Sequence, residues 1–173
     1  MTHRLSGVGP PAARSLAPAA MIRPARLGDE PVLRHLDHST WSSSHTPAPL
    51  PPPDRPFALD GVLVAELAEG LAGYSKLGPA LPFPATAHVL AIKGMSVFPA
   101  HRCRGIATVL LEATIAQAKT LGARRITLRV LSHNTAARRL YTAAGFETEG
   151  VLRDFFHLDG RYVDDVLMTL PLD

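Results

Sequence analysis

The stretch HVLAIKGMSVFPAHRCRGIATVLLEATIAQAKTLGARRITLRVLSHNTAARRLY, residues 88–141, decides the fold that this sequence predicts. Residues 88–97 predict a β-strand, in which Gly94 indicates a bulge. From Gly105 the apolar period becomes that of a helix, and Gly122 supplies a left-handed end. One face of this helix collects Ala107, Leu110, Leu111, Thr114, Ala118 and Leu121. Residues 126–130 then alternate apolar and polar, so two parallel strands joined by a right-handed helical crossover are predicted.

The turn before this helix, Arg102-Cys103-Arg104-Gly105-Ile106-Ala107, has the composition of an anion-binding site. The first N–H groups of a helix have no partners within the helix, and the helix dipole places partial positive charge there. Arg102 and Arg104 add formal charge, and Gly105 lets the backbone approach a ligand closely. The turn therefore suits a pyrophosphate. It has neither the spacing of a Walker loop nor the three glycines of a dinucleotide-binding loop.

Length and composition predict one globular domain and exclude several classes of protein. The chain has 173 residues, is 46% hydrophobic and carries a net charge of +3. It has no dense basic run and no apolar segment of membrane-spanning length, so we expect neither nucleic acid nor a membrane as partner. One cysteine excludes an internal disulfide framework and a cysteine-based zinc site, and the eight histidines show no metal spacing. We expect a cytoplasmic protein without a metal.

The first half of the chain predicts an extension followed by the beginning of the domain. Residues 1–20 are rich in Ala, Pro, Ser and Gly and predict a disordered extension, with the domain spanning residues 21–173. Asp29 is placed to cap a helix whose inner face carries Leu33, Leu36 and Trp41. Residues 46–56 are dense in proline and predict a loop. Residues 62–66 and 71–76 predict a hairpin.

The C-terminal part predicts one more helix and a closing hairpin. Asn134 is placed to cap a helix that ends at Gly145, and its inner face carries Ala137, Leu140, Tyr141 and Ala144. Residues 151–158 and 162–170 flank Asp159-Gly160, a dipeptide typical of tight hairpin turns.

These motifs, in this order, resemble those of the GNAT family of N-acetyltransferases. The resemblance rests on three motifs and covers residues 21–172: Arg102-x-x-Gly105-x-Ala107, Asn134-x-x-Ala137-x-x-Leu140-Tyr141 and Gly145-Phe146-Glu147. It implies a mixed α/β fold, with a twisted, mainly antiparallel sheet, one splayed pair of parallel strands and helices on both faces. The activity implied is that of a transferase moving an acetyl group from acetyl-CoA, as cosubstrate, to a primary amine by direct attack in a ternary complex.

The resemblance also assigns roles to residues. It implies that the coenzyme pyrophosphate binds at the basic turn, which consists of Arg102, Cys103, Arg104, Gly105, Ile106, Ala107 and Thr108. It implies that the pantetheine arm pairs with Met95, Ser96 and Val97 in the gap between the splayed strands. Contacts of Asn134 and Arg138 with the coenzyme are implied as well. Tyr141 resembles the family tyrosine beside the coenzyme sulfur and is our candidate acid for the leaving thiolate. The alternatives are a core position for Tyr141 and a plain helix cap for Asn134.

Several assignments stay open. Ala91 occupies the position that we align with a catalytic glutamate of many relatives, so the base is unassigned among His88, Glu66, Asp154, His157 and a water relay. The acceptor is a small-molecule amine or a protein N-terminus, and the family's frequent dimers suggest a homodimer. Cys103 is either a reactive thiol that bound coenzyme covers, or a small inert residue with a buried sulfur. A non-catalytic acyl-CoA sensor is the rival function.

Overall fold

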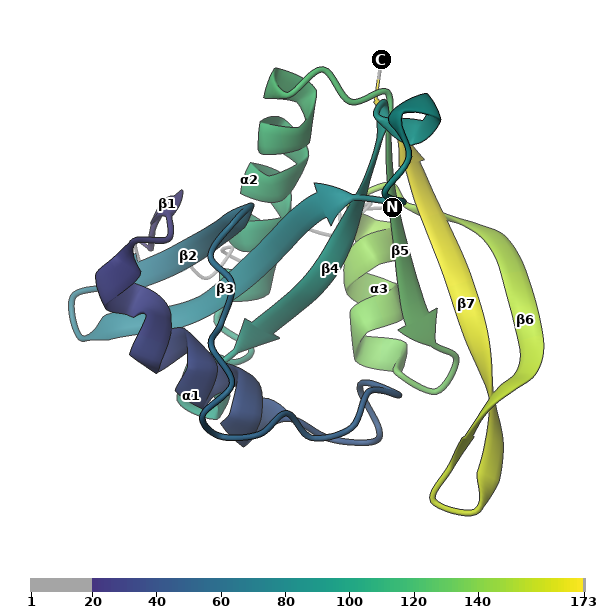
Figure 1. The fold of residues 1–173 in the computed structure, drawn as a ribbon, viewed down its shortest axis with the longest axis horizontal. Helices are drawn as coiled ribbons and strands as arrows, with labels where there is room; N and C mark the ends of the chain where they lie inside the picture. The colour runs from purple at the N-terminus through teal and green to yellow at the C-terminus, as the bar shows by residue number, and fades with distance from the viewer. Residues whose placement is uncertain (1–19, 173) are drawn as a thin grey trace, which may run out of the picture.

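A computed structural model describes residues 20–172, and they form a seven-stranded mixed sheet with helices on both faces (Figure 1). The strand order is β1-β2-β3-β4-β5-β7-β6, and every neighbouring pair is antiparallel except β4 and β5. The strands are β1 (Met21–Pro24), β2 (Val62–Leu67), β3 (Gly70–Pro79), β4 (Val89–Val97), β5 (Arg125–Leu131), β6 (Glu147–Leu158) and β7 (Arg161–Pro171). The predicted fold class is therefore confirmed. The predictions for residues 1–19 lie outside the described residues.

Three α-helices cover the sheet, α1 (Glu30–Thr40) on one face and α2 (Ile106–Thr120) and α3 (Thr135–Ala143) on the other. The short 3-10 helices are Leu27–Asp29, Pro84–Thr86 and Pro99–His101. Strand alternation explains the division, because Val62 and Val64 of β2 pack with α1 while Leu63 and Ala65 pack with α2. No helix within residues 20–172 is long and apolar enough to cross a membrane.

The helix after the basic turn begins and ends as predicted, but one member of its inner face is wrong. Gly122 has φ +75° and ends the helix, as expected. Leu121 is 66% exposed, because the chain leaves the helical path there and its side chain no longer follows the buried stripe. Ile106, which the periodicity did not select, is 1% exposed and packs against β2.

The start of α1 is also only partly as expected. Asp29 stands at the N-cap position, but its carboxylate caps no N–H group of α1. It accepts instead from the Arg26 N–H at 2.7 Å and from the Arg23 guanidinium at 2.7 Å. Leu33 and Leu36 are fully buried as predicted, whereas Trp41 lies beyond the helix and donates its indole N–H to Ala48.

The two parallel strands separate after a short contact, which is the splay that the resemblance implied. Pairing between β4 and β5 is limited to Val89↔Arg125, Leu90↔Ile126 and Ala91↔Thr127, although both strands continue beyond these residues. The expected bulge is confirmed, since Gly94 faces Lys76 and Ile92 faces Leu77, which leaves Lys93 as the extra residue. Among residues 20–172, the remaining half of β4 therefore has a neighbouring strand on the β3 side alone.

The C-terminal hairpin turns at Asp159-Gly160, where both residues have positive φ, at +49° and +76°. It contains irregularities that the alternation did not predict. The register shifts between Leu152 and Phe156, and Asp154 has φ +50° inside this bulge.

Candidate active site

The turn before α2 has the backbone geometry of an anion site. Gly105 has φ +80° and ψ 0°, a left-handed conformation that suits glycine, and it places the following N–H groups at the helix start. Within the described residues, the N–H groups from Cys103 to Ala107 make no backbone hydrogen bond. The Thr108 N–H is different, because it donates to the Gly105 carbonyl at 3.1 Å. The free amides therefore form a row that a phosphate oxygen can accept from.

The arginines of the turn are held by neighbouring groups. Arg102 Nε donates to the Val97 carbonyl at 3.1 Å, which ties the turn to the end of β4. Arg104 lies 3.0 Å from the His101 ring and 3.8 Å from Glu69. Both guanidinium groups belong to exposed residues, so both remain accessible to a ligand.

Cys103 is exposed and has φ +57°. The positive φ agrees with a glycine-like position in the turn. The alternative of a buried sulfur is therefore wrong, whereas the reactivity of the thiol and its protection by coenzyme stay predictions.

The edge of β4 that faces β5 is unpaired beside Met95, Ser96 and Val97. Their partners on β3 are Ser75, Tyr74 and Gly73, and no backbone partner lies on the other side among the described residues. An extended amide-containing arm could add to this edge as an extra strand does. The free edge leads directly from the bulge to the turn that carries the free amides.

Asn134 and Arg138 have structural partners. Asn134 Oδ1 accepts the Ala137 N–H at 3.2 Å, so the side chain caps α3. Arg138 Nη1 donates to the Ser132 carbonyl at 3.2 Å. The capping role of Asn134 is confirmed, and coenzyme contact by either residue stays a prediction.

Tyr141 combines a buried ring with an unpaired hydroxyl. The residue is 9% exposed and packs on Phe146 with ring centroids 5.7 Å apart. Its hydroxyl makes no hydrogen bond within the described residues, yet it is not among the fully buried unpaired atoms, so the oxygen opens to a surface. Burial raises the pKa of Tyr141 to about 12, which keeps the phenol protonated near neutral pH. The predicted alternative of a core position is therefore correct for the ring of Tyr141, while its hydroxyl remains available as a hydrogen-bond donor.

The four candidate bases are not gathered at one place. Glu66 lies beside the edge strand β1, where Arg23 donates to it at 2.6 Å and lowers its pKa. His157 packs on Tyr162 near the hairpin turn, with ring centroids 4.8 Å apart. Asp154 lies in the bulge of β6, and His88 is exposed just before β4. Ala91 is buried and offers no carboxylate.

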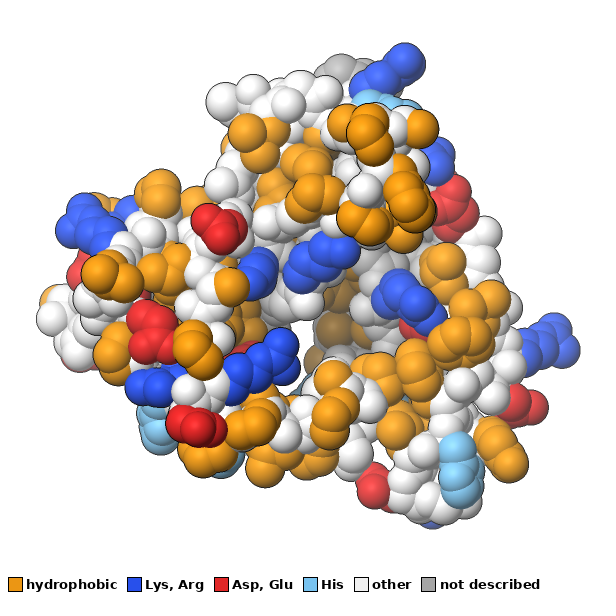
Figure 2. Space-filling model, viewed as in Figure 1, with side chains coloured by type: hydrophobic (Ala, Val, Ile, Leu, Met, Phe, Trp, Pro, Cys, Tyr) orange, Lys and Arg blue, Asp and Glu red, His pale blue; other side chains and the backbone are white. Residues whose placement is uncertain are grey.

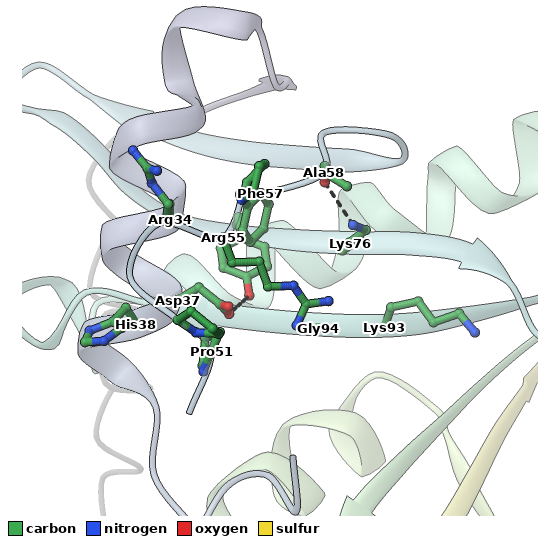
Figure 3. A pocket seen from close by; sticks show the side chains of 13 residues that line it. Arg34, Asp37, His38, Pro51, Arg55, Phe57, Ala58, Lys76, Lys93 and Gly94 are labelled. Carbon is green, nitrogen blue, oxygen red and sulfur yellow. Dashed lines mark hydrogen bonds between the residues drawn. The ribbon is translucent and has the colours of Figure 1, made fainter. Parts of the chain in front are cut away.

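A carboxylate that the periodicity did not reveal lies beside the bulge of β4. Tyr74 donates its hydroxyl to Asp37 Oδ1 at 2.7 Å (Figure 3). A Cβ at Gly94 would lie 3.4 Å from the Tyr74 hydroxyl, so this pair directly adjoins the bulge. Burial and the Asp37 carboxylate raise the pKa of Tyr74, which therefore stays a donor. The sequence contained one signal for this carboxylate. Asp37 is a charged residue four positions after Leu33, so it lies next to a buried residue on the inner face of α1.

Asp37 and Tyr74 line a cavity of about 310 Å³ between α1, the proline-rich loop, β3 and β4 (Figure 3). Its other lining residues are Arg34, His38, Pro51, Pro52, Arg55, Pro56, Phe57, Ala58, Lys76, Lys93 and Gly94. The cavity reaches the same bulge from which the free edge of β4 runs to the turn. Among the residues that the structure describes, no group of three His, Cys, Asp or Glu side chains could hold a metal ion.

The segment that follows α1 bridges to the C-terminal part of the sheet. Ser43 donates to Asp159 at 2.6 Å, and the Ser44 carbonyl lies 2.9 Å from the His133 ring. Burial and nearby Arg102 lower the pKa of His45 in this segment. The bridge thus spans the gap between the two halves of the splayed sheet.

The family model described as "Acetyltransferase (GNAT) family" matches residues 31–146, which include the cavity, the bulge, the turn and Tyr141. The chain belongs to this family. The resemblance that the motifs suggested is therefore confirmed, and it extends to the region where the structure places the free amides and the unpaired strand edge.

Similar proteins agree with this membership of the GNAT family. A [ribosomal protein bS18]-alanine N-acetyltransferase of Haemophilus ducreyi is 33% identical over 79 residues, 45% of this chain and 54% of that protein. The chain thus spans about half the length of this curated relative. A Streptococcus mutans structure has a TM-score of 0.79 at 29% identity, covering 88% of this chain and 99% of its own. The Salmonella typhimurium protein yncA, whose structure holds acetyl-CoA, has a TM-score of 0.75 at 25% identity, covering 89% and 94%.

Proposed function

We propose that this GNAT protein transfers an acetyl group from acetyl-CoA to a primary amine by direct attack in a ternary complex. The observation that carries the proposal is the continuous path from the free amides of residues 103–107 along the unpaired edge of β4 to the cavity at Gly94. The presence of acetyl-CoA in the similar yncA structure supports the choice of donor. The coenzyme supplies the acetyl group as a thioester.

The residues of the chain hold and orient the donor along this path. The amides of the turn and Arg102 bind the phosphates, and Met95 to Val97 offer backbone groups to the arm. Gly94 lies three residues before Val97, which is about 10 Å along a strand that rises ~3.3 Å per residue. An arm that follows the edge from the turn therefore brings its acyl end toward the bulge, next to Tyr74 and Asp37.

Proton transfer is the second requirement, because an amine with an ordinary pKa of ~10.4 arrives protonated at neutral pH. Asp37 is the carboxylate that lines the cavity, and we assign it the role of proton acceptor, directly or through water. Tyr74 orients this carboxylate by its hydrogen bond. Tyr141 donates its phenolic hydrogen toward the leaving thiolate. No activated cysteine–histidine pair is needed for this direct route.

The acceptor is a small-molecule amine or a protein N-terminus. The Haemophilus ducreyi relative is named for the acetylation of an N-terminal alanine of a ribosomal protein, which supports an α-amine as one acceptor class. The rival function, a non-catalytic sensor of acyl-CoA, predicts coenzyme binding without an acetylated product.

The test combines binding and turnover. Calorimetry should detect acetyl-CoA binding to the wild-type protein and a large loss of affinity in Gly105→Val, because a β-branched residue disfavours the left-handed conformation and blocks close approach of the phosphates. Mass spectrometry should detect acetylation of at least one member of a panel of peptides and small amines. Binding with no product from any amine would favour the sensor, and unchanged affinity in a folded Gly105→Val would reject the turn as the coenzyme site.

A further inference from the structure

The cavity beside the bulge is strongly cationic. Its lining includes the side chains of Arg34, Arg55, Lys76 and Lys93, against the single carboxylate of Asp37. Figure 2 shows Lys and Arg side chains on several sides of the hollow at the centre of this face. Acidic side chains are sparse around that hollow in the same view. Like charges that converge on one concavity create a positive potential that attracts anions.

Three of these cations have no ionic partner in the part of the chain that the structure describes. Arg34 lies 3.7 Å from Glu30, which offsets its charge. Within residues 20–172, neither Arg55, Lys76 nor Lys93 forms a salt bridge. Lys76 donates to the Ala58 carbonyl at 2.9 Å, and Lys93 to the Ala80 carbonyl at 3.3 Å, so each ammonium group keeps further N–H donors.

Arg55 is the cation best placed to meet a ligand. It projects from the loop after α1 across the cavity toward Gly94, between Asp37 and Lys93 (Figure 3). The Arg55 N–H donates to Pro52 in a turn, and the flanking prolines restrict the backbone that carries the side chain. A guanidinium group presents a planar fork that matches the two oxygens of a carboxylate or phosphonate. Arg55 makes no side-chain hydrogen bond among the described residues.

We infer that the acceptor amine carries an oxyanion, a carboxylate or a phosphate-like group, and that Arg55, Lys76 and Lys93 bind it. This inference rests on the proposed function, because it names the class of amine that the same site acetylates. The amine lies at the end of the cavity that Asp37 and Gly94 form, where the acyl group arrives, and the oxyanion lies on the cationic wall. Acceptors whose second group is cationic, such as diamines, are repelled by the same wall.

The coenzyme phosphates are a poor explanation for this cluster of cations. The turn at residues 103–107 already provides a site for these phosphates. The cavity ends at Gly94, which lies three residues before Val97 and therefore about 10 Å away along β4, since a strand rises ~3.3 Å per residue. The cavity also lies on the α1 side of the sheet, since Tyr74 packs with Leu33 and Leu36. The cations therefore serve a second ligand.

The test uses three amines of one chain length with different second groups: 4-aminobutyrate, 4-aminobutanamide and 1,4-diaminobutane. A fourth amine, 3-aminopropylphosphonate, distinguishes a phosphate-like group from a carboxylate. With the full chain and saturating acetyl-CoA, in a buffer without primary amines, we expect kcat/KM to be at least about 10-fold higher for an anionic amine than for the amide, the diamine being the poorest. Arg55→Gln should remove most of this preference through KM, while the affinity for acetyl-CoA stays unchanged.

Two further variants sharpen the result. Arg55→Glu should reverse the order and favour the diamine, a gain that a merely damaged protein cannot show. Lys119→Gln removes one positive charge from an exposed position on α2, on the opposite face of the sheet, and should keep the wild-type preference. Equal kcat/KM for the amide and the anionic amines would overturn the inference while leaving the acetyltransferase function intact. A loss of acetyl-CoA affinity in Arg55→Gln would also overturn it, by assigning the cations to the coenzyme.

If none of these amines is acetylated, a binding experiment with oxyanions tests the inference instead. Glutarate and inorganic phosphate are then titrated by calorimetry into the complex with coenzyme A. Binding to the wild type and to Lys119→Gln, but not to Arg55→Gln, would support an oxyanion site independently of turnover. No binding to the wild type would overturn it, whatever the outcome for catalysis.

Discussion

Replacing Tyr141 by phenylalanine tests how the protein handles the leaving thiolate. The change removes the hydroxyl and leaves the buried ring that packs on Phe146. The hydroxyl has no hydrogen-bond partner within the described residues, so its removal should change the free energy of unfolding by less than about 1 kcal/mol. The expected effect is therefore on turnover.

The pKa of Tyr141 determines the size of that effect. Burial raises the pKa to about 12. An ordinary thiol has a pKa of ~8.5, so complete proton transfer from this phenol to a thiolate would be uphill by ~3.5 pKa units, or about 5 kcal/mol. The phenol should therefore act as a hydrogen-bond donor to the developing charge. Such bonds to charged groups contribute ~1.5–3 kcal/mol, which corresponds to a fall in kcat of about 10- to 150-fold.

The assay measures kcat at saturating acetyl-CoA and amine, after a pre-steady-state experiment has shown no burst of product, so that chemistry limits the rate. Affinity for acetyl-CoA should change less than about twofold, because the interaction grows only in the transition state. Tyr162→Phe is the matched control, since Tyr162 is 69% exposed on the C-terminal hairpin and should keep the wild-type kcat. A wild-type kcat in Tyr141→Phe would reduce the residue to packing. A fall of ~10³-fold or more, which exceeds the contribution of one hydrogen bond and lies within the range of a general acid, would refute the hydrogen-bond argument.

Three further predictions concern other parts of the structure. Asp37→Asn keeps a hydrogen-bond acceptor for Tyr74 but removes the proposed base, so kcat/KM should fall by about 10²- to 10⁴-fold. The control Asp54→Asn, on the exposed loop, should leave kcat/KM unchanged. Equal kcat/KM in the two variants would reject Asp37 as the base. Cys103 should be alkylated by iodoacetamide in the free protein and protected by saturating coenzyme A, as measured by mass spectrometry, and labelling that coenzyme leaves unchanged would place the thiol away from the phosphates. The hydrogen bond from Arg23 holds the pKa of Asp29 below its ordinary value of 3.8, so this carboxylate stabilises the fold above that pH and the stabilisation disappears as the pH falls through the lower folded value. We therefore expect the free energy of unfolding in urea to fall less for Arg23→Gln than for the wild type when the pH is lowered from about 5 to about 2. If the two proteins lose the same free energy over this range, the assignment to Asp29 is contradicted.

Local signals were sufficient for most elements of the fold. Gly122 and Asp159-Gly160 adopt the positive φ values that their places in the sequence predicted, and Gly105, where a close backbone approach was expected, also has positive φ. These conformations depend on a few neighbouring residues, because glycine and aspartate can enter the left-handed region where most side chains cannot. The turn that we propose as the coenzyme site could therefore be located from sequence, and so could the bulge near Gly94.

Errors arose where the position of a side chain depends on distant parts of the chain. Leu121 fits the helical period of α2 but is exposed, because α2 ends at Thr120, before this position. The bulge of three residues in β6 is a property of its register with β7, which alternation alone does not reveal.

The sequence by itself determined the strand–helix–strand unit, the turn with its arginines and the candidate acid Tyr141, since each is encoded within a short stretch. Only the tertiary structure joined Asp37 to Tyr74, residues 37 positions apart, and brought Arg55, Lys76 and Lys93 around one cavity. The physical reason is that these contacts require β3 to pair with β4 in one register, and α1 and the proline-rich loop to pack over that pair. Such long-range placement leaves no periodic trace in the sequence, and for this reason the proposed base and the proposed oxyanion site emerged only from the folded chain.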